Sequence, residues 1–182
     1  MVQKWKVLDS QWALNEKWYK VRRDTLEIKP DQVIDYYIGI FHDVVMTIAV
    51  TPDNNVLLVR QYKHGVGDVI IELPAGVIDE GEDPLDAAKR ELREETGLIA
   101  VYSINLWRVE RSINDPRSPE HLVIFYRVQA RGDVINNDAD ENLAVQWKSI
   151  DEPIEIGFPV HKGIFNRIKD RPGDFFDYPF KM

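Results

Sequence analysis

The chain has 182 residues, a length that suits one domain of ordinary size with an added arm. It contains no cysteine, which excludes disulfides and thiol chemistry, and its formal net charge of −8 argues against nucleic-acid binding over its general surface. No apolar run approaches the ~20 residues needed to cross a bilayer, and the N-terminus lacks the apolar core of a signal peptide. We therefore expect a cytoplasmic protein that binds neither nucleic acid nor membranes.

The first 41 residues are rich in strand-forming and aromatic residues. Their pattern predicts strands near residues 4–8, 17–28 and 35–41, with a turn at Lys29-Pro30-Asp31. A small antiparallel sheet of this kind is marginally stable alone and needs a partner surface. We therefore expect residues 1–41 to form an N-terminal antiparallel β arm, followed by a main domain over residues 42–182.

The main domain begins with continuous apolar runs, which are typical of strands covered on both faces. These runs are VVMTIAV at 44–50, VLLVRQY at 56–62 and VIIELPAG at 69–76. Later strands are predicted at 100–111, 122–130 and 145–150, and a short helix at 161–169. Because a buried helix is predicted between the two groups of strands, the order suggests an α/β fold, an α/β/α sandwich with a mixed sheet.

The central helix has strong signals at both ends. Asp83 can cap its N-terminus, Pro84 suits the first helical position, and Gly97 provides a left-handed stop. A helix over these residues would place three glutamates on one stripe.

The stripe consists of Glu91, Glu94 and Glu95, because residues three and four apart are neighbours on a helix. Crowded carboxylates repel one another, and Arg90 can offset only part of that repulsion. Hard divalent cations take oxygen ligands, so the stripe indicates a magnesium-type site. An ordinary solvated helix face is the alternative, and the spacing of the surrounding residues decides between them.

Residues 76–98 read GVIDEGEDPLDAAKRELREETGL and match the pattern Gly-x5-Glu-x7-Arg-Glu-U-x-Glu-Glu-x-Gly-U, where U is apolar. At about 7% per fixed position, a chance match has a probability on the order of 10⁻⁸. The stretch resembles the Nudix hydrolase box, and the match is complete. The resemblance implies the Nudix α/β/α sandwich, and hydrolysis of nucleoside diphosphates linked to another moiety with magnesium or manganese.

The resemblance also implies roles for residues in and near the box. The expected metal ligands are Glu91, Glu95, Glu94 and the backbone carbonyl of Ala75. Glu94 and Glu95 are also counted among the catalytic residues, Glu94 for supporting a further ion or orienting water. Glu82 either reaches the metal shell or is only a carboxylate at the helix N-terminus. Arg90 is expected to hold a glutamate in place.

The stretch VRQYKHGVGDVIIELPAG narrows the resemblance to the ADP-ribose and nucleoside diphosphate sugar pyrophosphatase branch. That branch commonly shows Gln-Tyr-Arg followed by Glu-Leu-Pro-Ala-Gly, whereas this chain has Lys63 at the arginine position. Lysine keeps the charge but loses the bidentate geometry. The candidate substrate contacts are Arg60, Lys63, Glu72 and, for stacking on a nucleobase, Trp18. In relatives of this branch an N-terminal sheet crosses to a second subunit, so we expect a homodimer.

In the same branch the general base is a glutamate on a loop after the box. The matching loop here is GDVINNDADENLAV at 132–145. Glu141 is the first candidate, and its rivals are Asp138, Asp140 and Glu120. An exposed polar loop without a catalytic role would have the same composition, so the base remains open.

Together these features predict a Nudix pyrophosphatase that hydrolyses ADP-ribose or another nucleoside diphosphate sugar to a nucleoside monophosphate and a sugar phosphate. One alternative keeps this chemistry but changes the substrate to GDP-mannose, NADH or a dinucleoside polyphosphate. Another is a Nudix fold that senses a nucleotide sugar without cleaving it. The intact glutamate cluster argues against a sensor, which does not need it.

Overall fold

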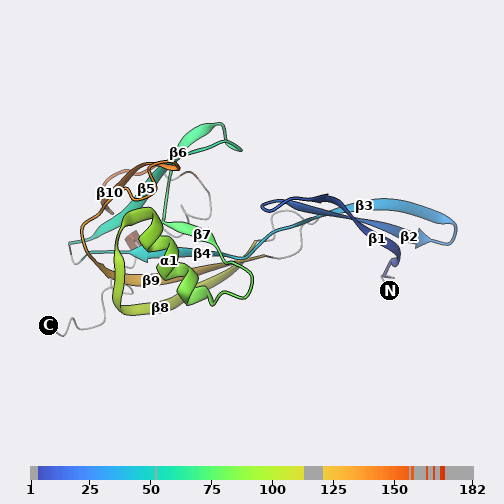
Figure 1. Cartoon of the computed structure of the whole chain (residues 1–182), viewed down its shortest axis with the longest axis horizontal. Helices are drawn as coiled ribbons and strands as arrows, with labels where there is room; N and C mark the ends of the chain where they lie inside the picture. The colour runs from blue at the N-terminus through green and yellow to red at the C-terminus, as the bar shows by residue number, and fades with distance from the viewer. Residues whose placement is uncertain are drawn as a thin grey trace. The chain divides into compact units, whose positions relative to one another are not determined.

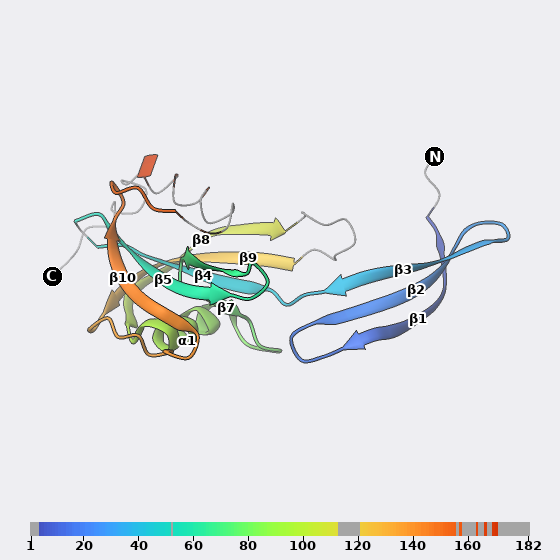
Figure 2. The same cartoon turned by 90° about the horizontal axis from the view of Figure 1, so that it is seen from above.

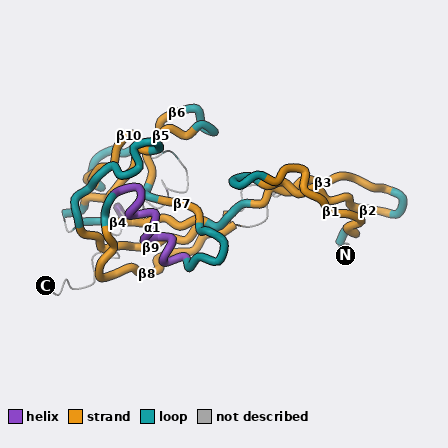
Figure 3. Tube along the Cα trace, viewed as in Figure 1, coloured by secondary structure: helices purple, strands orange, loops and turns teal. Residues whose placement is uncertain are grey.

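The computed structural model describes residues 4–51, 53–112 and 121–155, together with residues 157, 163, 166, 169 and 170. Its elements fall into two compact units (Figures 1 and 3). Unit 1 comprises Met1–Asp43 and Glu110–Leu122, and unit 2 comprises Val44–Val109 and Val123–Met182. The division into an arm and a main domain at residue 41 stays a prediction, and unit 1 includes a second segment that the sequence did not indicate.

Unit 1 contains a three-stranded antiparallel sheet, which we call the arm sheet. Its strands are β1 (Lys6–Asn15), β2 (Lys20–Lys29) and β3 (Gln32–Ile40), in the order β1-β2-β3. The expected N-terminal antiparallel strands are therefore present. The tight turn between β2 and β3 places Asp31 at a φ of 61°, a left-handed conformation that aspartate tolerates.

Several strand bounds in the arm sheet differ from the expectation, and β3 begins at Gln32 instead of residue 35. β1 continues to Asn15 instead of ending near residue 8. Every residue of β1 is exposed, so no buried face marks its limits in the sequence. β2 begins at Lys20 instead of residue 17, because the N–H of Glu16 donates to the carbonyl of Tyr19 (3.1 Å) and closes a turn.

Unit 2 is built on two sheets. The four-stranded sheet has the order β7-β4-β9-β8, from β7 (Ala75–Val77), β4 (Val44–Ala49), β9 (His121–Arg131) and β8 (Ile99–Ser112). The three-stranded sheet has the order β10-β5-β6, from β10 (Asn142–Ser149), β5 (Asn55–Lys63) and β6 (Asp68–Glu72). β4 runs antiparallel to β7 and parallel to β9, which confirms the expected mixed sheet.

The core of unit 2 comes from the continuous apolar runs. Residues 56–59 of β5 are all fully buried, as expected for a strand covered on both faces. The main core cluster consists of Met46, Ile48, Val56, Leu58, Leu73, Val123, Phe125 and Ile150. It joins strands of both sheets, which fixes β4 and β5 as a rigid support for the elements that follow them.

The helix α1 (Pro84–Thr96) forms the second half of the box and packs against β4 and β7 (Figure 2). Its ends are as expected: the carboxylate of Asp83 accepts from the N–H of Leu85 (2.8 Å), and Gly97 is left-handed, with a φ of 72°. Leu92 is fully buried on the face toward the sheet. The burial of Leu92 fixes the rotation of α1 about its axis, and so determines which glutamates of the stripe face the sheet.

The predicted helix at 161–169 falls mostly outside the described residues, although Gly163, Asn166 and Lys169 are helical. Among the residues that the structure describes, no helix is long and apolar enough to span a bilayer.

Candidate active site

Strand β7 and helix α1 bring the first and second halves of the box together. A Cβ atom at Gly76 would collide with the carboxylate of Glu91, so the β7 backbone lies directly against that side chain. One residue earlier, the N–H of Ala75 donates to Oε2 of Glu95 (3.1 Å). Three of the expected metal ligands, Ala75, Glu91 and Glu95, are therefore neighbours in the structure.

The two glutamates that face β7 are in an unfavourable electrostatic setting. Burial, and after it the charge of Glu91, raise the pKa of the Glu95 carboxyl to about 8. Burial also raises the pKa of Glu91, although the adjacent Arg90 guanidinium opposes the shift. A divalent cation would remove both costs, because it replaces lost hydration and neutralises the repulsion. The donor set therefore fits a hard cation.

Arg90 binds a carboxylate from each half of the box, Glu82 before α1 and Glu91 within it. Its Nε and Nη2 donate to the two oxygens of Glu82 (2.9 and 2.7 Å), and its Nη1 donates to Oε1 of Glu91 (2.7 Å). Hydrogen bonding from Arg90 lowers the pKa of Glu82 to about 2. Nη2 also donates to the carbonyl of Val77 (3.0 Å), which ties α1 to β7. Arg90 thus holds glutamates in place, as the sequence suggested.

Glu94 lies apart from the buried pair. Its side chain is 59% exposed and accepts from Nη1 of Arg90 at 3.3 Å. In the described part of the chain, no group of three or more histidine, aspartate or glutamate side chains is arranged to hold a metal ion. The ligand candidates against β7 are thus two carboxylates and a backbone position, and the roles of Glu94 in metal binding and catalysis stay predictions.

The candidate substrate residues on β5 and β6 separate into two faces. Lys63 and Glu72 form an ion pair, with 3.4 Å between Nζ and Oε2. Arg60 is exposed and lies on the opposite face of β5, because successive side chains of a strand alternate. Contact of each residue with a substrate stays a prediction.

Sequence reasoning overlooked Gln61, whose Nε2 donates to Oε2 of Glu72 (2.8 Å). The available signal was its position two residues before Lys63, which puts both side chains on one face of β5.

The loop proposed to carry the general base is attached to the C-terminal end of α1. The N–H of Ile135 donates to the carbonyl of Thr96 (3.0 Å). Glu141 is exposed, and its N–H donates to the carboxylate of Asp138 (3.3 Å). Asp140 is exposed as well, and Glu120 lies outside the described residues. The choice of base stays a prediction.

Two asparagines in this loop also escaped sequence reasoning. The Oδ1 of Asn136 and both polar side-chain atoms of Asn142 are buried without a hydrogen-bond partner. The Nδ2 of Asn136 donates to the carbonyl of Asn142 (2.6 Å), which closes the end of the loop. No composition signal separates these two from the other polar residues of the loop.

Trp18, the candidate for stacking on a nucleobase, belongs to unit 1. Its side chain is 65% exposed, and the ammonium of Lys17 lies 4.0 Å from the centroid of the ring. The ring is thus accessible, and its role with a nucleobase stays a prediction.

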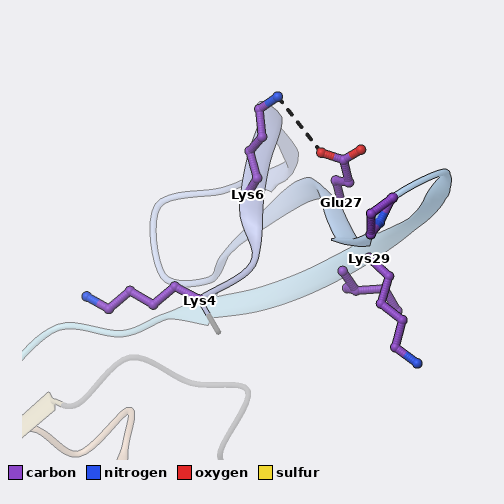
Figure 4. Close-up of a pocket in the computed structure, with 6 residues that line it drawn as sticks. Lys4, Lys6, Glu27 and Lys29 are labelled. Atoms are coloured by element: carbon purple, nitrogen blue, oxygen red, sulfur yellow. Dashed lines mark ion pairs between the residues drawn. The ribbon is translucent and has the colours of Figure 1, made fainter. Parts of the chain in front are cut away.

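A pocket of about 250 Å³ in unit 1 is lined by Lys4, Lys6, Glu27, Ile28, Lys29 and Pro30. Figure 4 shows that the ammonium groups of the three lysines point in different directions, and that Lys6 is paired with Glu27, with 3.9 Å between Nζ and Oε2. The groups do not converge on one point, and none of the candidate site residues lines this pocket. The candidate active site is therefore the one between β7 and α1.

This fold and this box define a class of enzyme. The chain belongs to the NUDIX domain family, whose model matches residues 40–168. The expectation of a Nudix hydrolase is thereby confirmed.

Among curated proteins, the chain is 34% identical over 152 residues to "Methanol dehydrogenase activator" of Bacillus methanolicus, covering 82% of this chain and 81% of the relative. It is 41% identical over 112 residues to "ADP-ribose pyrophosphatase" of Bacillus subtilis, covering 62% of this chain and 60% of the relative. It is 35% identical over 141 residues to the protein of the same name from Mycobacterium tuberculosis, covering 74% and 65%. The expected likeness to ADP-ribose pyrophosphatases is present, over less than two thirds of their length.

Among solved structures, the fold of the chain resembles the one described as "Crystal structure of ADP compounds hydrolase", with a TM-score of 0.72. The match covers 96% of this chain and 97% of the other at 18% identity, so it supports the fold.

Proposed function

We propose that this Nudix hydrolase cleaves the diphosphate bond of ADP-ribose or another nucleoside diphosphate sugar, and that it requires Mg²⁺ or Mn²⁺. The observation that carries the proposal is the pair of buried Glu95 and partly buried Glu91 against β7, with the pKa of Glu95 raised to about 8. A divalent cation bound by the two carboxylates would offset the repulsion between them. The likeness to two ADP-ribose pyrophosphatases supports the substrate class.

The residues of the site would have two separate roles, binding the metal and orienting its ligands. Glu91, Glu95 and the carbonyl of Ala75 would hold the metal, which when bound neutralises a diphosphate and lowers the pKa of water. The N–H of Ala75 fixes one oxygen of Glu95, and Arg90 fixes one oxygen of Glu91, so both carboxylates are oriented before substrate arrives.

Lys63 would donate to a phosphate oxygen. Glu141 would take the proton of the water that attacks one phosphorus in line, and the other phosphate would leave.

The test is hydrolysis of ADP-ribose with and without Mg²⁺, in the wild type and in Glu95→Gln. Loss of a ligand should cost at least the ~10–100-fold that is typical when a metal site loses a supporting residue. The rise in melting temperature caused by Mg²⁺ should disappear in the same variant. Glu80→Gln removes an equal charge from an exposed position of the box and serves as the control. Equal rates in wild type and Glu95→Gln would refute the metal assignment.

The choice of substrate needs a direct comparison. GDP-mannose, NADH and a dinucleoside polyphosphate should be screened beside ADP-ribose under one set of conditions. A higher kcat/KM for one of them would keep the mechanism and replace the substrate. Tight binding without turnover at any metal concentration would favour a sensor.

We further propose that the enzyme is a homodimer assembled through the arm sheet. Support comes from the exposed large hydrophobic residues of residues 4–43, namely Trp5, Val7, Leu8, Trp12, Leu14, Trp18, Tyr19, Val33, Tyr37 and Phe41. Apolar surface on this scale marks an interaction site. The lack of cysteine fits the reducing environment of the cytoplasm, where we propose that the enzyme works.

A further inference from the structure

One buried carboxylate in unit 2 is not explained by the metal site. Glu72 is 5% exposed, and its Oε2 accepts from the amide of Gln61 at 2.8 Å. The same oxygen lies 3.4 Å from the ammonium of Lys63. Gln61 is also 5% exposed, whereas the side chain of Lys63 is 39% exposed. The contacts therefore run from the interior toward the surface and end on a cation.

The pairing of β5 with β6 explains why these three side chains meet. Gln61 and Lys63 share one face of β5, because they are two residues apart. Val59 is the partner of Glu72, so Glu72 lies on that same face and diagonal to Gln61. Lys63 is the partner of Asp68 in this register, and its long side chain reaches back along the strand to Glu72.

The ion pair lies next to the residues that join β7 to α1. Glu72 is three residues before Ala75, which is at most about 11 Å of chain. The N–H of Ala75 donates to Oε2 of Glu95 (3.1 Å), and Gly76 lies against the carboxylate of Glu91. A diphosphate held at Glu91 and Glu95 would therefore lie near the ion pair of Glu72 and Lys63.

We propose that Gln61 and Glu72 are positioning residues that hold the ammonium of Lys63 against the diphosphate of the substrate. This inference rests on the proposed function, since it needs a diphosphate beside Glu91 and Glu95. Lys63 touches the substrate, whereas Gln61 and Glu72 act through it. The amide of Gln61 fixes the plane of the Glu72 carboxylate, and the carboxylate fixes the direction of the ammonium.

A positioning role of Glu72 can be distinguished from an effect of its charge alone. Lys63 and Glu72 together are neutral, so the pair adds a directed donor without adding net positive charge. Removing the negative charge of Glu72 would improve the binding of an anion if only net charge mattered. If Glu72 positions Lys63, the same change weakens binding, because the ammonium loses its direction. The two explanations predict opposite signs.

The experiment measures the Kd of a methylene-bridged analogue of ADP-ribose, which cannot be hydrolysed, by calorimetry in the presence of Mg²⁺. The variants are Lys63→Ala, Glu72→Gln, Gln61→Met and the double variant Lys63→Ala/Glu72→Gln, with Glu80→Gln as the control. Loss of a hydrogen bond between charged groups should raise Kd about tenfold in Lys63→Ala. Glu72→Gln should raise it several-fold and Gln61→Met less.

The double variant should bind like Lys63→Ala alone, since the two residues act as one unit. A tighter Kd or an unchanged Kd for Glu72→Gln overturns the inference, and so do independent effects that multiply in the double variant. Melting temperatures identify any variant that fails to fold, and Gln61→Met then carries the test, because it removes the donor and leaves the ion pair.

Steady-state kinetics with ADP-ribose provide the second readout. A positioning role should appear as a raised KM in Glu72→Gln, with kcat within about twofold of wild type, and Lys63→Arg should retain more affinity than Lys63→Ala. If the wild type binds the analogue but hydrolyses no nucleotide sugar, the proposed function fails and the Kd series still decides the inference. If the wild type does not bind the analogue, the inference fails as well.

Discussion

The arm sheet and unit 2 differ in what covers their strands. In β1 every residue is exposed, whereas residues 56–59 of β5 are fully buried. Among residues 4–43, the buried side chains are Asp24 and Leu26. Unit 2 has its own core and, beside that core, a buried set of acidic groups that includes Glu72 and Glu95. One region thus has apolar surface without a cover, and the other buries the carboxyl of Glu95, which forms no ion pair with the described residues.

This difference shows what each region needs from outside itself. The arm sheet is too small to bury its own aromatic residues, so a second copy of the chain is the partner we propose. Its buried carboxylate, Asp24, is already neutralised, because Arg22 donates to both of its oxygens (2.8 and 2.9 Å) and Ser10 donates to one (2.7 Å). In unit 2, the carboxylate of Glu95 has the N–H of Ala75 as a donor and Glu91 as a repelling neighbour. That contrast is why we propose a cation in unit 2 only.

The largest effect is expected at Gly76 in unit 2. Gly76→Ala introduces a Cβ where the carboxylate of Glu91 now lies, and this flexible side chain must move away. We expect hydrolysis to fall about 10–100-fold, because a metal ligand is displaced. The melting temperature without metal should change little, since the clash involves the end of a side chain and Gly76 is not in a left-handed conformation. Rates and melting curves with and without Mg²⁺ measure both effects.

Gly65→Ala is the matched control, because a Cβ at that position meets nothing within 4 Å. Unchanged activity in Gly76→Ala would mean that the position of Glu91 against β7 is unimportant for the reaction. A large loss of melting temperature in the absence of metal would instead assign Gly76 a structural role.

The second effect concerns the arm sheet. Trp12→Ala removes an indole that is 51% exposed in the chain and that we propose is buried between two copies. A tryptophan at the centre of an interface typically contributes 2 kcal/mol or more, so the dimer Kd should rise roughly 30-fold. Sedimentation velocity over a range of concentrations measures this constant. Lys6→Ala, which truncates a side chain that is 72% exposed, should leave it nearly unchanged.

A wild-type protein that stays monomeric at micromolar concentrations would contradict the dimer. The exposed aromatic residues of the arm sheet would then bind a different partner. The proposal of a missing partner would still hold for unit 2, where the partner is a cation.

The features that depend on local residue spacing could be predicted from the sequence. The caps of α1 at Asp83 and Gly97 follow from residue type alone, and the position of Arg90 before the glutamates predicted its structural role. The parallel pairing of β4 with β9 could not be predicted, because the two strands are about seventy residues apart and local periodicity does not encode partners. For the same reason Gln61 was overlooked, since its value depends on the register of β5 against β6.

The smallest effect is expected at Glu82. Its carboxylate is ion-paired with Arg90, whereas Glu95 forms no ion pair with the described residues. Hydrogen bonds from Arg90 lower the pKa of Glu82 to about 2 from an ordinary value of 4.5. A folded pKa below the unfolded value contributes stability that is present above pH 4.5 and is lost as the pH falls toward 2. Glu82→Gln should therefore be less stable than wild type by about 1 kcal/mol at pH 7. The difference should shrink between pH 4.5 and 2.

Thermal unfolding between pH 2 and 7 measures this difference, with Glu80→Gln as the control, because Glu80 is exposed and also lies in the box. A difference between Glu82→Gln and wild type that stays constant over the whole range would mean that the charge of Glu82 is not what Arg90 stabilises. Arg90 would then stabilise the box through the carbonyl of Val77 and the carboxylate of Glu91, at 3.0 and 2.7 Å. Glu82 would contribute only through its shape, as a neutral glutamine does.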